Sequence, residues 1–331
     1  MSTAKIVFML LSNMQSCILL EYFTSLPEIS DYKENSIFTE ALNLVNNLLD
    51  DIVQQTSIKE VHILRNYKLR KKKIRKVVYH ITSPEKNIFS ILKSFPKNSP
   101  LIFIAPETDG ISLKIIKKIN NKFFLLHSPP QMVELFSSKR ETYKALQEKE
   151  IPCIPEKKPH EIKKNFIIIK PEHGAGSEEV YYLKKSNVTI STGVVCQEYY
   201  SGRKASFSMI CKSGQSSVLG CNIHIMKKEK RRFFQVGSLI GGAEKYRNDF
   251  ESLARKISQR FSNLYGFIGV DVVKFLDKWY VVEINCRFTS SYIGLKTVYG
   301  ENIVKTIFNL YFQNVLSSPN IIVEKNKRLI F

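Results

Sequence analysis

Short apolar runs alternate with longer stretches of helical period along the first part of the chain. The helical stretches are residues 36–52 and 112–119, where apolar side chains recur every three or four positions, as on a helix with one buried face. Strands that alternate with helices in this way predict a parallel, doubly wound sheet, so the N-terminal part is expected to be an α/β domain. The short apolar runs, each predicted to be a strand, are residues 5–11, 61–64, 77–81, 101–105 and 123–126.

The pattern changes after residue 137, where short predicted strands follow one another with few helices between them. A helix is predicted over residues 138–150, an amphipathic helix over 249–264 and a closing helix over about 303–315. Because successive strands joined by short turns pair antiparallel, this part is expected to be α+β. The predicted strands are residues 166–170, 180–183, 194–200, 218–224, 233–236, 266–275 and 279–285.

The last predicted hairpin carries oxygen-bearing side chains on otherwise apolar strands. Asp271 lies on its first strand, and Glu283 and Asn285 are two residues apart on its second, so that these two share a face. Buried carboxylates are costly unless something neutralises them. Mg²⁺ does so, because it takes oxygen ligands and usually also bridges substrate phosphates. The alternative is that Arg287 alone neutralises an acid here.

A β-branched strand that ends at Lys170 runs into a glycine-rich segment. Gly174, Ala175, Gly176 and Ser177 can bring backbone N–H groups close to phosphates, where Lys170 would add a positive charge. The order differs from that of a P-loop, because the lysine precedes the glycines. The segment is a candidate phosphate-binding loop, although most such glycine-rich segments have another role.

The strand predicted over 194–200 ends in polar and aromatic residues. Gln197, Glu198, Tyr199 and Tyr200 could bind the edge of an adenine ring between apolar neighbours. The alternative is an ordinary strand that leads into a turn.

Two acids, Glu107 and Asp109, follow the strand predicted over 101–105. Ligands of doubly wound sheets lie at the carboxyl ends of the strands, so both acids are candidate lining residues of a site. The alternative is a capped loop before a helix.

Charge is the unusual feature of an otherwise ordinary globular composition. Of the 331 residues, 44% are hydrophobic and 24% charged, and 50 basic against 30 acidic side chains give a net charge of +20. Residues 65–76 hold eight basic residues and no acid, and residues 227–232 hold five basic residues and one acid. Three interpretations stay open, namely a nucleic acid partner, a lysine-rich surface without a specific partner, and a polyanionic small substrate.

The six cysteines are scattered without a close pair, which favours neither a zinc site nor a disulfide framework. A reducing, cytoplasmic location is therefore expected. No apolar run reaches the roughly 18 residues that a membrane span needs, so no membrane partner is expected.

Taken in chain order, the candidate motifs resemble the ATP-grasp family over about the last 200 residues. The resemblance implies ATP held between two α+β subdomains, with Mg²⁺ as a second cofactor. It implies that Lys139 and Lys170 bind the nucleotide phosphates. It also implies a phosphate loop at residues 174–177 and an adenine-binding segment at residues 197–200.

The resemblance also gives roles to the last hairpin. It implies that Asp271, Glu283 and Asn285 are magnesium ligands and that Arg287 is the arginine that often follows them. Lys170 and Arg287 would stabilise the phosphoryl group during transfer. Lys204 stands where many members carry an acid for the ribose, so no ribose contact is expected from this position.

Three domains and one reaction follow from the resemblance. The expected boundaries are an N-terminal α/β domain over 1–135, a central and lid subdomain over 136–200, and a C-terminal subdomain with the magnesium site over 201–331. The expected reaction joins a carboxylate to an amine with ATP through an acyl phosphate. A rival interpretation is a basic nucleic-acid-binding protein on an inactive ATP-grasp shell, but it leaves the acids of the last hairpin unexplained. Members of the family are often dimers, so a homodimer is also an expectation.

The first third of the chain resembles, more loosely, the N-terminal domain of the tyramine–glutamate ligase group, which serves methanofuran biosynthesis. The likeness lies in residues 38–43, 48–51 and 105–110. It implies glutamate or an oligoglutamyl chain as the acid and an aromatic amine such as tyramine or tyrosine. Another amino-acid or polyglutamate ligase stays open as an alternative. The residues expected on the substrate side are Glu107, Asp109, His224, Arg231 and Arg232.

Overall fold

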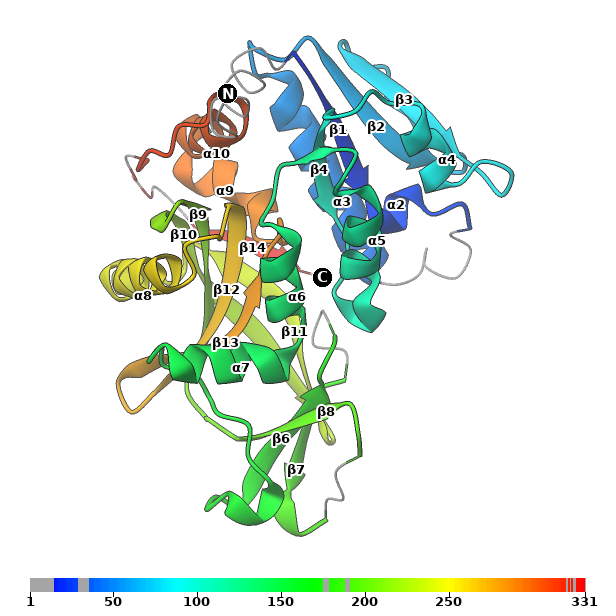
Figure 1. Cartoon of the computed structure of the whole chain (residues 1–331). Coiled ribbons are helices and arrows are strands. Elements are labelled where there is room, and N and C mark those ends of the chain that lie inside the picture. Colours follow the sequence, from blue (N-terminus) through cyan, green and yellow to red (C-terminus); the bar gives the residue numbers. More distant parts are fainter. Residues whose placement is uncertain are drawn as a thin grey trace.

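The computed structural model describes residues 15–28, 36–174, 179–187, 191–319, 321, 323 and 326–330. One of its two sheets is parallel, with the strand order β3-β2-β1-β4-β5, which confirms the parallel sheet predicted for the N-terminal part (Figure 1). The strand predicted over residues 5–11 lies outside the described residues. The strands are β1 (Ser16–Glu21), β2 (Glu60–Asn66), β3 (Val77–Thr82), β4 (Pro100–Ile104) and β5 (Phe124–Leu125).

Helices cover both faces of the parallel sheet because successive strand residues point to opposite faces. Helix α3 (Ser36–Val53) packs on the face that contains Leu19, in one apolar cluster with it. Helices α4 (Ile88–Lys93) and α5 (Ile111–Ile119) pack on the face that contains Leu20. The carboxyl ends of the strands, which bear Glu107 through the segment after β4, remain available for a site.

The second sheet is long, curled and antiparallel, with the strand order β13-β12-β9-β10-β11-β7-β6-β8, and β14 pairs with β11 (Figure 1). The antiparallel pairing and the α+β class predicted for this part are confirmed. Strands β9 and β14 were not predicted. The strands are β6 (Phe166–Pro171), β7 (Tyr181–Lys184), β8 (Val194–Glu198), β9 (Lys204–Lys212), β10 (Gln215–Glu229), β11 (Arg232–Ile240), β12 (Gly266–Phe275), β13 (Lys278–Asn285) and β14 (Lys327–Ile330).

The three helices predicted after residue 137 are present, and four helices of the structure, α2, α4, α6 and α9, were not predicted. Among the described residues, none of the helices combines the length and the apolar character that crossing a membrane requires. The helices outside the parallel sheet's own layers are α2 (Tyr22–Ser25), α6 (Pro130–Ser137), α7 (Lys139–Glu148), α8 (Arg247–Arg260), α9 (Tyr292–Tyr299) and α10 (Glu301–Gln313).

The basic run 227–232 forms the end of the β10–β11 hairpin, and this end reaches β7. The backbone N–H of Tyr182 donates to the Arg231 carbonyl at 2.8 Å, and that of Phe233 donates to the Val180 carbonyl at 2.9 Å. The hairpin thereby joins the β6–β8 part to the rest of the sheet.

Helix α3 also contacts α9, more than two hundred residues further along the chain. The Tyr292 hydroxyl donates to Asp51 Oδ2 at 2.7 Å, and Lys296 Nζ lies 3.3 Å from Asp51 Oδ1. Asp51 is buried, and burial raises the pKa of its carboxyl group. These contacts fasten the parallel sheet's helix layer to the C-terminal helices.

Candidate active site

A cleft with a volume of about 1170 Å³ lies where β6 and β8 face β12 and β13, and the segment after β4 borders it. Most of the residues predicted for a nucleotide and metal site line this cleft. Glu107, Arg231, Asn285 and Arg287 do not line it, and Ala175, Gly176 and Ser177 lie outside the described residues. The predicted residues that line the cleft are Asp109, Lys139, Lys170, Gly174, Gln197, Glu198, Tyr199, Tyr200, His224, Arg232, Asp271 and Glu283.

Asp271 and Glu283 lie directly opposite each other on β12 and β13. Asn285 is two residues beyond Glu283 in the same uninterrupted register, opposite Gly269. Burial raises the pKa of Glu283, and the neighbouring charge of Asp271 raises it further, while Lys139 and Lys170 lower it. Two opposed carboxylates inside a cleft favour positive charge beside them, and Lys139 Nζ lies 3.8 Å from Glu283 Oε1.

The donor set fits Mg²⁺. Mg²⁺ in nucleotide sites is usually held by one or two carboxylates together with phosphates and waters, rather than by a complete cage of protein ligands. Asp271 and Glu283 supply the two carboxylates, and Asn285 can add an amide oxygen. Among the described residues, no three His, Cys, Asp or Glu side chains form a group that could hold a metal ion.

Two lysines place positive charge at the same end of the cleft. Lys139, the first residue of α7, donates from Nζ to the Gly174 carbonyl at 2.7 Å and lies 3.8 Å from Glu283 Oε1. Lys170, near the end of β6, is only 6% exposed. Burial lowers the pKa of Lys170 to about 7, and the charge of Lys139 acts in the same direction. Both amines would be stabilised as cations by bound phosphates.

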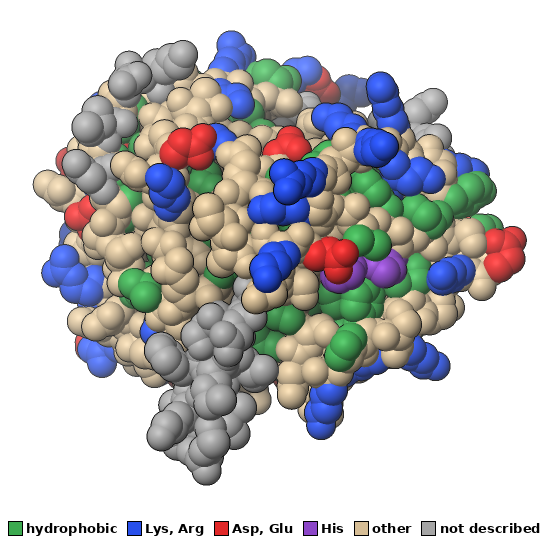
Figure 2. Space-filling model, turned by 90° about the horizontal axis from the view of Figure 1, so that it is seen from above, with side chains coloured by type: hydrophobic (Ala, Val, Ile, Leu, Met, Phe, Trp, Pro, Cys, Tyr) green, Lys and Arg blue, Asp and Glu red, His purple; other side chains and the backbone are tan. Residues whose placement is uncertain are grey.

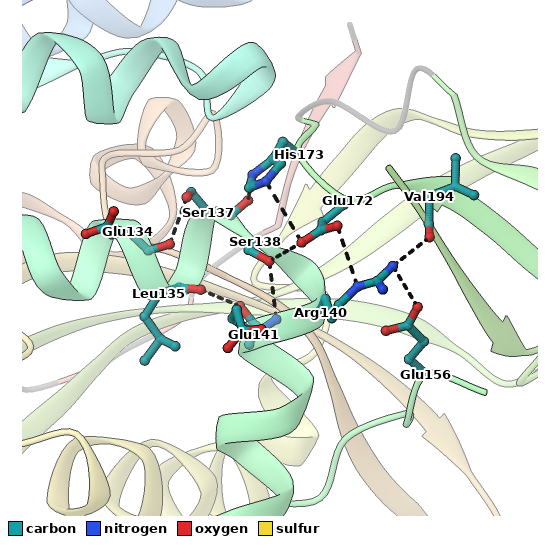
Figure 3. A network of polar contacts seen from close by, with 11 residues as sticks. Glu134, Leu135, Ser137, Ser138, Arg140, Glu141, Glu156, Glu172, His173 and Val194 are labelled. Carbon is teal, nitrogen blue, oxygen red and sulfur yellow. Dashed lines mark hydrogen bonds and ion pairs between the residues drawn. The ribbon is translucent and has the colours of Figure 1, made fainter. Parts of the chain in front are cut away.

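A polar network fixes the chain at the point where β6 leads into residue 174 (Figure 3). Ser138 Oγ donates to Glu172 Oε1 at 2.7 Å and accepts from the Glu141 N–H at 3.2 Å, which also caps α7. Arg140 connects the same carboxylate, at 3.5 Å, with Glu156, at 3.0 Å. His173 donates from Nδ1 to the Ser137 carbonyl at 3.0 Å and so has a structural partner. The start of the glycine-rich segment is thereby held against α7.

The segment predicted to bind adenine has mixed roles. Gln197 is buried, and its side chain donates to the Ile154 carbonyl, which also lines the cleft. Glu198 Oε1 lies 3.1 Å from Lys164 Nζ at the more exposed end of β8. Backbone groups of this segment are therefore the better candidates for contact with a base, because the Gln197 side chain already has a partner.

Lys204 was noted in the sequence only as a departure, yet it lines the cleft. Its ammonium group donates to the Tyr200 carbonyl and lies 5.3 Å from the centre of the Tyr199 ring. Burial lowers the pKa of Lys204 to about 8. No role in the cleft was predicted for Lys204, because a lysine is not the acid that many members of the family carry at this position.

Arg287 binds Glu107 through two parallel hydrogen bonds. Nε donates to Oε1 at 2.8 Å and Nη2 donates to Oε2 at 2.7 Å. Burial opposes the charge of Arg287, but the Glu107 carboxylate outweighs it and raises the pKa of Arg287. Glu107 is 7% exposed and lies behind the cleft wall that Thr108 and Asp109 form. The arginine after the β12–β13 hairpin is thus paired with an acid from the N-terminal part.

The remaining predicted substrate residues divide between the cleft and the surface. His224 lines the cleft, and its Nε2 lies 3.2 Å from Asp271 Oδ1. Arg232 also lines the cleft, next to Phe233 and Gln235. Arg231 is exposed in the turn of the β10–β11 hairpin.

Comparison with known proteins shows what the part of the chain that forms this site is similar to. Residues 136–291 match the family of ATP-grasp domains. Tyramine–L-glutamate ligase of Methanocaldococcus jannaschii is 25% identical over 220 residues, which are 64% of this chain and 63% of that protein. The namesake of Methanocaldococcus fervens is 24% identical over 273 residues, which are 81% of this chain and 86% of that protein. The alignment with the first relative thus spans less than two thirds of its length.

Solved structures support the fold. An ATP-grasp superfamily protein from Archaeoglobus fulgidus aligns with a TM-score of 0.69 at 21% identity, over 95% of this chain and 90% of that one. An L-amino acid ligase from Bacillus licheniformis aligns with a TM-score of 0.60 at 16% identity, over 90% of this chain and 74% of that one. At these identities the likeness shows the ATP-grasp fold.

Proposed function

Residues 136–291 form an ATP-grasp domain that resembles the tyramine–glutamate ligase group, and from this premise we propose that the chain is an ATP-dependent carboxylate–amine ligase. The observation that carries the proposal is the meeting of Lys139 and Lys170 with the opposed pair Asp271 and Glu283 in one cleft. Cations for phosphates and carboxylates for a metal are what ATP-dependent phosphoryl transfer needs.

The proposed reaction has two steps. An oxygen of the substrate carboxylate attacks the γ-phosphorus of ATP, the bond to the β-phosphate oxygen breaks, and ADP leaves. The amine then attacks the carbonyl carbon of the acyl phosphate, the C–N bond forms, and phosphate leaves with the electron pair of the broken C–O bond. The attacking nitrogen releases its extra protons to the solvent or to phosphate.

Named residues of the chain carry the electrostatic part of this chemistry. Lys139 and Lys170 bind the phosphates and offset the charge on the transferred group. Arg287, which follows the β12–β13 hairpin, adds the positive charge of a guanidinium. Asp271, Glu283 and Asn285 would hold Mg²⁺, which would supply positive charge against that of the phosphates. No protein nucleophile is required.

For the substrates, we propose glutamate as the acid and an aromatic amine such as tyramine or tyrosine, as in methanofuran-type cofactor biosynthesis. The names of the two relatives support this choice. Arg232, which lines the cleft, could bind a carboxylate of the acid or of an oligoglutamyl chain. The alternative within the same chemistry is another amino-acid or polyglutamate ligase.

ADP release with Mg²⁺–ATP and glutamate, measured against a panel of amines, tests the proposal. Release that depends on tyramine or tyrosine is the expected result. Release with glutamate alone would indicate chain extension instead. Failure to bind Mg²⁺–ADP would contradict the ligase proposal as a whole. Light scattering in the same buffer would test the homodimer expected from the family.

A basic surface favours one second candidate function, the binding of nucleic acid. Arg65 is buried and donates to Asn46, so it does not belong to this surface. Figure 2 shows Lys and Arg side chains spread widely over the face seen from above. Binding of labelled RNA that weakens steeply with salt, without ATP turnover, would support this candidate. Within residues 65–76, the exposed cations for which no ion pair with an acid of the described residues is present are Lys68, Arg70, Lys71, Lys72, Lys73 and Arg75.

A further inference from the structure

The geometry points to Glu107 as a positioning residue that holds Arg287 in the orientation needed to receive the phosphoryl group. The inference rests on the proposed ligase function and adds to it a role for the N-terminal part of the chain. Neither Glu107 nor Arg287 lines the cleft, but Glu283 does, and its charge acts on Arg287, so Glu107 affects the cleft through the placement of Arg287.

The hydrogen bonds of Arg287 leave part of the guanidinium available. A guanidinium has five N–H bonds in a fixed plane. Two of them go to Glu107, and Nη1 donates to the Phe288 carbonyl at 3.3 Å. The bidentate pair fixes the plane, because two parallel bonds permit only one orientation. The remaining N–H bonds are then presented in a constant direction to an anion.

Other acids would compete for Arg287 if Glu107 were absent. The charges of Glu283 and Glu40 both act on the pKa of Arg287. Burial raises the pKa of Glu40, while the Ser290 hydroxyl and Arg287 lower it, so the Glu40 carboxylate is only partly compensated. A freed Arg287 would turn toward one of these carboxylates. In the case of Glu283 it would also compete with the metal.

Glu107 is itself held by a rigid segment that borders the cleft. The Gly110 N–H donates to the Glu107 carbonyl at 3.0 Å. Asp109 and Gly110 have left-handed backbones, with φ of 54° and 66°. Such a conformation is unfavourable for Asp109 and persists only where its surroundings hold it. Thr108, Asp109 and Gly110 line the cleft, so the residues that face a substrate and the residue that orients Arg287 are neighbours.

A test that needs no turnover uses the product complex. We would titrate inorganic phosphate into protein saturated with Mg²⁺–ADP, for the wild type, Glu107→Gln and Arg287→Lys. Glu107→Gln is expected to lower the affinity for phosphate by about tenfold, because the guanidinium loses its fixed orientation. The affinity for Mg²⁺–ADP should stay within about twofold of the wild type. The double variant should bind phosphate no more weakly than the single variant with the lower affinity, since both substitutions disrupt the same interaction.

The matched control is Glu134→Gln. Glu134 is an exposed acid on α6 whose carboxylate pairs with Lys117 at 2.8 Å, so the substitution removes an ion pair in which Arg287 takes no part. Phosphate affinity of this variant should equal that of the wild type. In turnover, Glu107→Gln should lower kcat by about ten- to a hundredfold with little change in the KM for ATP, as expected for a misplaced group.

A spectroscopic readout separates this inference from the proposed function. The Nε–H of Arg287 should give a ¹⁵N signal protected from exchange in the wild type and in Glu134→Gln, but not in Glu107→Gln. Absence of that protection in the wild type would overturn the inference, whatever the protein binds. Equal losses of phosphate and Mg²⁺–ADP affinity would overturn it as well, because they would indicate a structural role alone. A wild type that shows the protected signal but does not bind Mg²⁺–ADP would overturn the ligase proposal and leave Glu107 as the orienting partner of Arg287.

Discussion

Lys139 and Lys170 both line the cleft, and the positive charge of Lys139 helps to lower the pKa of Lys170. Burial is the larger cause and lowers the pKa of Lys170 to about 7, against an ordinary value near 10.5. At neutral pH the Lys170 side chain is therefore only partly charged, and a bound phosphate has to restore its proton.

Nucleotide affinity should therefore fall as the pH rises above about 7. The charged form of Lys170 binds phosphates, so binding is coupled to uptake of a proton once the free amine predominates. The expected slope approaches a tenfold loss per pH unit between about pH 7.5 and 9. Calorimetric titration of Mg²⁺–ADP in buffers of different ionisation enthalpy measures the proton uptake. Lys170→Arg is the control, because arginine stays charged and should remove the part of the slope that Lys170 causes.

The same shift has a consequence for stability without ligand. The folded-state pKa of Lys170 lies below its unfolded value, so the unfolded chain binds more protons between about pH 7 and 10. The buried amine of Lys170 therefore lowers the free energy of unfolding at neutral pH, and this penalty becomes smaller as the pH rises. Lys170→Met should raise the free energy of unfolding measured by denaturant at about pH 7, while abolishing nucleotide binding. A lower unfolding free energy in that variant would show that the buried amine is better compensated than its pKa indicates.

Removing one carboxylate of the metal pair should separate activity from stability. Asp271→Asn loses a magnesium ligand, so ATP turnover should fall by at least about a hundredfold. The unfolding free energy of the metal-free protein should not fall, since the substitution removes a charge that opposes ionisation of Glu283. Thermal unfolding with and without Mg²⁺–ADP measures both effects. If this variant keeps the activity of the wild type, Asp271 is not a ligand.

The cap of α7 should be measurable on its own. Ser138→Ala removes the acceptor for the Glu141 N–H and the donor to Glu172, so it should cost about 1 kcal/mol or somewhat more. Ser138→Thr keeps a hydroxyl and should stay within about 0.5 kcal/mol of the wild type. Urea unfolding of both variants gives the comparison. Equal stability of the two would mean that solvent replaces the hydroxyl at this position.

The contact between α3 and α9 should depend on one hydroxyl. Tyr292→Phe leaves the buried carboxylate of Asp51 with only Lys296, so the expected cost is about 1–3 kcal/mol. The control is Tyr181→Phe, which removes the hydroxyl of an exposed tyrosine. In the background of Asp51→Asn the loss on Tyr292→Phe should shrink, because the uncompensated charge is gone.

Local patterns were sufficient to predict the hairpin that carries Asp271 and Glu283. Its strands are neighbours in sequence, and both Leu276 and Asp277 of its turn have positive φ, so the pairing follows from a short stretch of chain. Strand β9 was missed for the opposite reason. Ser206 and Ser208 are buried among apolar residues of that strand, and a buried polar position gives no signal in a hydropathy pattern.

Contacts between distant segments were not available from the sequence. Glu107 and Arg287 are 180 residues apart, and nothing in either local pattern indicates that they pair. Each was predicted as a site residue from its own neighbourhood, but the structure makes one the partner of the other. The strand Ser16–Glu21 escaped prediction because the apolar run at residues 5–11 offered an equally good pattern nearby.

The contact of Tyr292 with Asp51 limits how the chain can be recombined. A chimera that takes its first 135 residues from a distant relative would bring in a foreign residue opposite Tyr292, and it would leave an unmatched buried hydroxyl or carboxylate behind. Exchanging residue 51 and residue 292 together avoids this mismatch. Residues 51 and 292 are thus expected to covary during evolution. An exchange of the N-terminal part between relatives would need paired substitutions at these two positions.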